Sequence, residues 1–171
     1  MQARPIIHGA LVLVLAGAHA AGAVRVGELE VKEDHAGVPC FTIPEAEERR
    51  SGAPDFQSIS VAEVGARTPM WRMAMPGPRT FSVSFRMCIP YAGRLPVLPQ
   101  MPAATLQAGK PYDVTIEARP GQQAGAPRSY RARFCMVQQG PGPLRVQLLG
   151  SGAPDARARR SCQGGPSLSA P

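Results

Sequence analysis

The sequence predicts an all-β fold, a single antiparallel β-sandwich of the immunoglobulin-like kind with about seven or eight strands. Three observations predict it. Apolar and polar residues alternate with a period of two in several segments, turn-forming residues separate these segments, and helical periodicity is almost absent. The chain holds 18 glycines and 19 prolines in 171 residues, a composition that favours short strands joined by turns over long helices.

Four segments show the clearest alternation, residues 81–87, 112–118, 130–136 and 144–148. In the first of them Phe81, Val83, Phe85 and Met87 alternate with polar side chains. Such segments are typical of antiparallel strands with one face in the core and one face in water. Weaker patterns predict further strands at residues 24–31, 38–43, 58–64 and 71–75.

The chain offers one short helix candidate, residues 44–50, in which acidic residues precede two arginines as the helix dipole favours. A polar loop fits the same residues. From Gly150 to Pro171 the chain is small, polar and basic, which predicts a mobile tail except where Cys162 ties it down. The folded domain is therefore expected to span residues 21–149.

Residues 1–20 have the features of a secretory signal peptide. Arg4 supplies a positive charge, residues 6–15 are mainly apolar, and Ala18 and Ala20 are the small residues that a signal peptidase reads. The apolar run is too short to cross a membrane. We expect cleavage after Ala20 and export to the periplasm, with secretion to the outside as the alternative. Because Ala18 stands where a lipoprotein signal carries cysteine, no lipid anchor is expected.

Charge is distributed unevenly along the chain. Residues 21–64 hold nine acidic and four basic residues, whereas residues 65–171 hold three acidic and fourteen basic ones. The basic residues are mainly arginines that occur singly, and no nucleic-acid-binding motif accompanies them. We therefore expect an acidic protein partner rather than a nucleic acid.

The four cysteines predict disulfides, because an exported chain folds in an oxidising compartment. Cys40, Cys88 and Cys135 are each out of phase with their core-facing neighbours, so they lean towards outer faces or strand ends. Three pairings are possible, and these positions alone do not choose among them. We favour Cys40–Cys88 and Cys135–Cys162, the second of which anchors the start of the tail.

Several common catalytic motifs do not occur in the sequence, and the carboxylates that could form a catalytic pair, Glu28, Glu30, Glu45 and Glu47, fit a solvated acidic face better. His35 is the only histidine after the signal, and neither a Gly-x-Ser-x-Gly motif nor a phosphate-binding glycine loop occurs. Metal ligands are not clustered at a recognised spacing. The sequence therefore predicts a non-enzymatic binding protein with no metal and no cofactor.

Four short motifs, in order, resemble those of the periplasmic immunity proteins associated with type VI secretion. They are VPCFTIP at residues 38–44, MCIPY at 87–91, LQAGKPY at 106–112 and YRARFC at 130–135. The resemblance covers about 110 residues, from Val26 to Val137. It implies that Cys40 pairs with Cys88 and that the protein binds and neutralises a toxin delivered into the periplasm. Cys135, Cys162 and the basic tail depart from the pattern of that family.

Exposed aromatic residues and arginines dominate interface energies, so we select such residues as candidate partner contacts. They are Trp71, Arg72, Arg79, Tyr91 and Arg94, the last at the start of the loop that ends at Pro99. An envelope accessory or small-ligand-binding protein is the alternative function. In that case the proline-rich segment 91–102 is expected to act as a lid or a docking strand.

Overall fold

A computed structural model of the chain describes residues 25–93, 98–119, 123, 125–138, 141–150 and 152–163. The expected signal peptide, Arg94 and residues 164–171 lie outside the described residues. The described part is mostly β. Its strands are β1 (Gly27–Glu28), β2 (Glu30–Glu33), β3 (Pro39–Thr42), β4 (Asp55–Glu63), β5 (Trp71–Ala74), β6 (Ile89–Pro90), β7 (Pro111–Arg119), β8 (Ser129–Gln138) and β9 (Leu144–Leu149), and its helices are α1 (Glu45–Ser51) and α2 (Asp155–Cys162).

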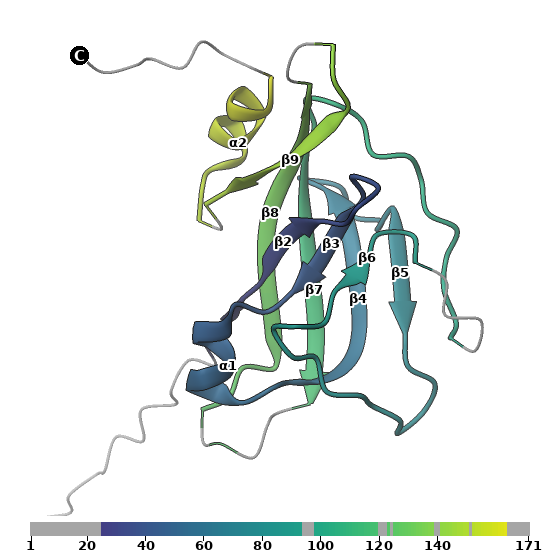
Figure 1. Ribbon diagram of the computed structural model, residues 1–171, viewed down its shortest axis with the longest axis vertical. Coiled ribbons are helices and arrows are strands. Elements are labelled where there is room, and N and C mark those ends of the chain that lie inside the picture. The colour runs from purple at the N-terminus through teal and green to yellow at the C-terminus, as the bar shows by residue number, and fades with distance from the viewer. Residues whose placement is uncertain are drawn as a thin grey trace, which may run out of the picture.

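The strands form two sheets, and the smaller sheet lies over one face of the larger (Figure 1). The six-stranded sheet has the order β1-β8-β7-β4-β5, with β9 also paired to β8, and the three-stranded sheet has the order β2-β3-β6. The chain passes from the large sheet to the small one between β1 and β2. All pairings within the sheets are antiparallel except β1 with β8.

The parallel pair depends on a glycine. A Cβ atom at Gly27 would lie 2.3 Å from the Tyr130 ring, so only glycine permits this close approach of β1 to β8. This pair departs from the purely antiparallel arrangement that we expected.

One apolar core joins the two sheets. The Phe41 ring of β3 lies 6.3 Å from Trp71 of β5 and 5.8 Å from Phe134 of β8, measured between ring centroids. Tyr112 of β7 extends this contact, with its ring 5.6 Å from that of Phe134. Alternate residues of β4, β5, β7 and β8 thus face the small sheet, and the residues between them face the opposite way.

Most predicted elements are confirmed. Strands β7, β8 and β9 occupy three of the four segments with clear alternation, and β1 to β5 occupy the four weaker ones. Helix α1 forms at the predicted place, with Glu45, Glu47 and Glu48 in its first turn. Helix α2 was missed, because residues 155–162 were assigned to the tail.

The predicted strand at residues 81–87 is wrong. Only Ser82 forms an isolated bridge, with Asp55, and the chain then turns at residues 85–86. The Phe85 amide donates to the Glu48 carboxylate at 2.6 Å, so a side chain takes the place of a strand partner. The alternation reflects burial, since Val83 is fully buried and the Phe81 ring stacks on Phe56 at 4.7 Å.

The disulfides are Cys40–Cys88 and Cys135–Cys162, as we predicted. Their Cα atoms lie 5.4 and 5.8 Å apart, within the range usual for disulfides. Two such bonds indicate an oxidising, extracytoplasmic environment. None of the helices in the described part of the chain has the length and apolar character that crossing a membrane requires.

A partly buried ion pair fastens the start of the described chain to α1. The Arg25 guanidinium donates to both Glu47 carboxylate oxygens, at 2.9 and 2.6 Å, and to the Ser51 hydroxyl at 2.6 Å. The Glu47 side chain is only 2% exposed, whereas that of Arg25 is 35% exposed. The hydrogen bonds from Arg25 hold the pKa of Glu47 below its usual value, although burial opposes this shift.

We expect Arg25→Ala to lower the free energy of unfolding by about 2 kcal/mol at pH 7, because it removes the cation that hydrogen-bonds to the buried Glu47 carboxylate and leaves only Arg50, 3.9 Å away. The matched control is Lys32→Ala, which removes a cation from the exposed pair with Glu30 and is expected to cost about 0.5 kcal/mol or less. Urea unfolding measures both. Equal losses in the two variants would contradict the structural role of Arg25.

The stability that Arg25 provides is also expected to depend on pH. Because the folded-state pKa of Glu47 is lowered, the contribution is complete above the unfolded-state pKa of about 4.3 and is lost as pH falls through the folded-state value. The difference in unfolding free energy between wild type and Arg25→Ala, measured with urea, should therefore shrink as the pH is lowered from about 5 to about 2. A difference that stays constant over this range would contradict the assignment.

Candidate partner-binding face

The two aromatic residues among the predicted partner contacts, Trp71 and Tyr91, are buried and not exposed as that prediction requires. Trp71 is 1% exposed and Tyr91 is 8% exposed, and their rings meet edge to face at 5.4 Å. The Tyr91 hydroxyl donates to the Ala104 carbonyl at 2.6 Å, and burial raises the pKa of Tyr91 to about 12. Trp71 has the same phase as Met73 in β5, which directs both side chains into the core. Arg72 and Arg79 are exposed as predicted.

In the segment expected to act as a lid or docking strand, residues 99–102 lie along the edge of β5 in the same sheet. The Ala74 amide donates to the Pro99 carbonyl. In the other direction, the Met101 amide donates to the Arg72 carbonyl and the Ala104 amide donates to the Met70 carbonyl. Residues 99–104 therefore cover the free edge of β5, which makes this edge unavailable to a partner strand.

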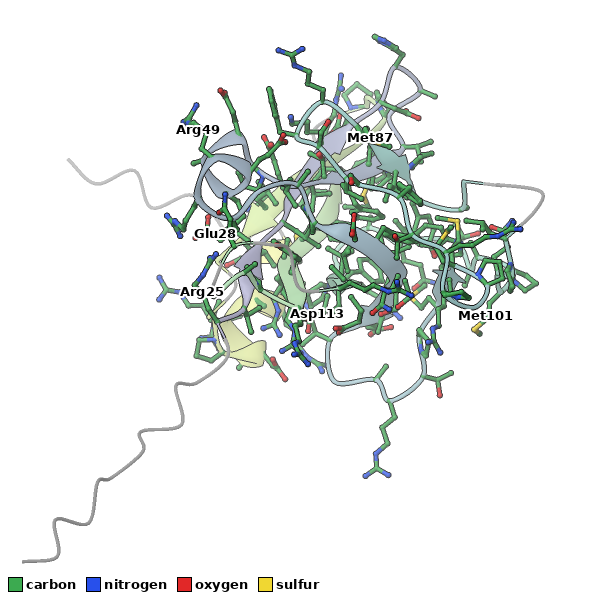
Figure 2. All side chains as sticks on the ribbon, turned by 90° about the horizontal axis from the view of Figure 1, so that it is seen from below. Arg25, Glu28, Arg49, Met87, Met101 and Asp113 are labelled. Carbon is green, nitrogen blue, oxygen red and sulfur yellow. A yellow bond between two sulfur atoms is a disulfide. The ribbon has the colours of Figure 1, made fainter. Side chains whose placement is uncertain are left out.

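The candidate site is the face of the six-stranded sheet that points away from the small sheet, called here the open face. It is formed by the side chains between the core-facing residues of β4, β5, β7 and β8. Asp113 belongs to it and lies on the side of the molecule opposite Met87 and Arg49 (Figure 2). The strand register sets one row across its middle, in which Arg72, Ser60, Thr115 and Arg131 are neighbours and Glu28 of β1 follows Arg131 at the outer edge.

The two arginines of this row have no acidic partner among the described residues, and both are exposed. Ser60 and Thr115 lie between them, and because their side chains are short, the surface of the face is lower there than at the two arginines. The open face thus presents two guanidinium groups that form no ion pair among the described residues, Arg72 at one end of the row and Arg131 between Thr115 and Glu28. Planar guanidinium groups bind carboxylates through paired hydrogen bonds.

A hollow of about 320 Å³ lies at the Arg131 end of the row, lined in part by Ala62, Asp113, Thr115, Arg131 and Arg133. Arg133 is engaged with Asp113, Asp155 and the Ala153 carbonyl. Within this hollow, Arg131 is therefore the cation whose donors have no partner among the described residues.

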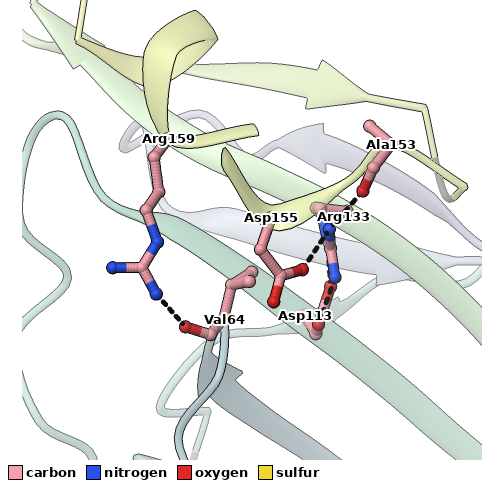
Figure 3. Close-up of polar contacts among 6 residues, drawn as sticks. All are labelled: Val64, Asp113, Arg133, Ala153, Asp155 and Arg159. Carbon is pink, nitrogen blue, oxygen red and sulfur yellow. Dashed lines mark hydrogen bonds and ion pairs between the residues drawn. The ribbon is translucent and has the colours of Figure 1, made fainter. Parts of the chain in front are cut away.

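Arg133 joins the sheet to the segment that leads into α2 (Figure 3). Its guanidinium donates to both Asp113 oxygens, at 2.6 and 2.9 Å, to the Ala153 carbonyl at 2.7 Å and to Asp155 at 3.1 Å. The hydrogen bond with Asp113 raises the pKa of Arg133 above its usual value. These bonds fix one border of the open face.

Helix α2 is held on the same border by three further contacts. Cys162 is bonded to Cys135 of β8 and packs with Val137 and Leu149 in a small apolar cluster. Arg159 donates to the Val64 carbonyl at 3.1 Å. The signal that sequence analysis overlooked is Asp155 early and Arg159 and Arg160 late in an Ala- and Arg-rich stretch, the charge order that a helix dipole favours.

We expect the double variant Cys135→Ala/Cys162→Ala to lose about 3 to 4 kcal/mol of unfolding free energy, because the disulfide closes a loop with a sequence separation of 27 residues. Urea unfolding measures the loss. Ser161→Ala, an exposed change on the same helix, is the control and should have almost no effect. If the double variant were as stable as this control, the disulfide would not be what anchors α2.

No family model matches the chain, and no curated protein and no solved structure matches it either. The features that bear on function are the geometry and charge of the open face, together with the oxidising compartment that the disulfides indicate.

Proposed function

We propose that this is a non-enzymatic periplasmic binding protein, exported through a cleaved signal peptide at residues 1–20, that binds an acidic protein on its open face. We further propose that the bound protein is a toxin delivered by type VI secretion, which binding neutralises. The observation that carries the proposal is the row in which Arg72 and Arg131 are exposed without acidic partners on either side of Ser60 and Thr115.

The shape of the row supports a protein partner. Side chains as short as serine and threonine let another surface approach the sheet closely, so that the two arginines meet carboxylates at the rim of the contact. Arginine is enriched at protein interfaces, and charge complementarity of this kind accelerates association. The border formed by Arg133, Asp113 and α2 limits how a partner can be oriented.

The toxin part of the proposal depends on the resemblance to the periplasmic immunity proteins. Two of its motifs, at residues 38–44 and 87–91, supply the two cysteines that are bonded to each other. This is the pairing that the resemblance implied, and it supports the proposal without naming the toxin.

An immunoglobulin-like sandwich is also proposed, as the finer description of the fold. The shared core of the two sheets supports it, because Phe41 of one sheet contacts Trp71 and Phe134 of the other. The parallel β1–β8 pair and the two-residue strand β6 would be its departures from a regular antiparallel sandwich.

The proposed function is tested by capture with the exported, disulfide-bonded protein. Wild type and the variant Arg72→Glu/Arg131→Glu are immobilised and exposed to periplasmic extract and to extract of neighbouring cells, and captured proteins are quantified by mass spectrometry. We expect wild type to enrich one acidic protein at least about tenfold over the charge-reversal variant, because each reversal replaces an attraction with a repulsion. Added salt should weaken the capture.

The control is Arg49→Glu, which makes the same reversal at one position on α1, at an exposed pair with Glu45 on the other side of the molecule (Figure 2), and it is compared with the single variants Arg72→Glu and Arg131→Glu. It should capture the partner as wild type does. The captured protein is then produced in the periplasm of a test strain, where it should stop growth unless wild type is produced with it. Equal capture by wild type and by the Arg72→Glu/Arg131→Glu variant would refute the proposal. A captured partner that does not stop growth would also refute it.

A further inference from the structure

We propose that an apolar cleft between β5 and β6 binds the hydrocarbon chain of a fatty acid, at a site separate from the open face. β5 and β6 are the last strands of their sheets on the same side of the molecule (Figure 1). The sheets are joined through β1 and β2 at the other side, so this is the side on which the core opens. The cleft has a volume of about 400 Å³.

The walls of the cleft come from both sheets. Met73 of β5 and Phe81 form one wall, and Ile89 and Pro90 of β6 with the preceding Met87 form the other. Met73 and Ile89 are buried core residues, whereas Met87 is 41% exposed at the mouth. The cleft therefore leads from the surface to the core.

The lining of the cleft determines the chemistry of its occupant. None of the described residues that line it carries a charged side chain or a side-chain hydroxyl or amide. Water needs two to four polar partners to be held in a cavity, so water fills this cleft poorly. A flexible hydrocarbon chain suits it, because methionine side chains adapt to irregular apolar shapes. The volume is within the range of small-ligand sites, about 300 to 1,000 Å³.

The Cys40–Cys88 disulfide keeps the outer wall in place. Cys88 lines the cleft between Met87 and Ile89, and its bond ties this wall to β3. Ile89 and Pro90 also pair with Phe41 and Cys40 in the small sheet. The cleft is thus held open by covalent and strand contacts without a ligand, and an occupant need not order it.

Two exposed arginines lie within two residues of the cleft lining in the sequence, although neither lines the cleft itself. Arg79 precedes Phe81 by two residues and Arg86 directly precedes Met87, so both walls are preceded by an exposed cation. Neither arginine has an ion-pair partner in the described part of the chain, although Arg86 lies over the Phe85 ring at 5.2 Å. The nearby carboxylates of Glu48 and Asp55 accept from the Phe85 amide and the Ser82 hydroxyl. We assign the carboxylate of the fatty acid to these two arginines.

The test is a titration of the exported, disulfide-bonded protein with cis-parinaric acid, a fluorescent C18 fatty acid. We expect saturable binding, and Met87→Asp should weaken it at least about tenfold, because a carboxylate at the mouth repels the head group and opposes entry of the chain. Met101→Asp is the matched control. Met101 is 42% exposed but does not line the cleft, and binding to this variant should equal that of wild type (Figure 2).

Two further measurements do not depend on Met87→Asp being folded. In the wild type, the methyl resonances of Met73 and Met87 should shift on addition of the fatty acid while that of Met101 does not. Arg79→Ala/Arg86→Ala should weaken fatty-acid binding about fivefold and leave binding of the matching fatty alcohol unchanged. Absence of binding, shifts at Met101 equal to those at Met87, or dimerisation that closes the cleft would overturn the proposal. None of these outcomes bears on capture by the open face.

Discussion

Phe41 is fully buried between the two sheets, against Trp71 on one side and Phe134 on the other. This aromatic contact sets which residues of the large sheet face inward. Trp71 must point to Phe41, so Arg72 must point away, and the same phase in β8 directs Phe134 inward and Arg133 outward. The open face exists because one side of each strand is committed to the small sheet. Its two unpaired arginines follow from the same alternation.

The alternation also explains how much of the molecule its sequence predicts. Strands β7, β8 and β9 pair over long stretches, so burial and hydrogen bonding agree and the period of two identifies them. At residues 81–87 burial and hydrogen bonding disagree. Val83 is buried as a strand residue would be, but the Phe85 amide donates to the Glu48 carboxylate of α1 instead of to a strand partner. Such a contact between segments far apart in the chain produces no pattern in the local sequence.

The candidate site was only partly predictable for a related reason. An aromatic residue and an arginine next to each other in a strand, such as Trp71 and Arg72, cannot share a face, so only one of them can meet a partner. Residue type alone selects both of them as candidate partner contacts. Arg131 was not selected because it became notable only when register placed it in one row with Arg72 across β4 and β7. Helix α2 owes its place to a disulfide and to Arg133, which connect segments far apart in the sequence.

The strip of chain that covers β5 bears on how the protein behaves at high concentration. A sheet grows into aggregates through an edge strand whose amides and carbonyls are unpaired. Here residues 99–104 occupy the edge of β5, and Pro99 and Pro102 have no amide hydrogen to offer outward. On this side the six-stranded sheet ends in a proline-rich border that does not template another strand. The protein thereby gains protection from self-association at the place where the edge of its largest sheet would otherwise be exposed.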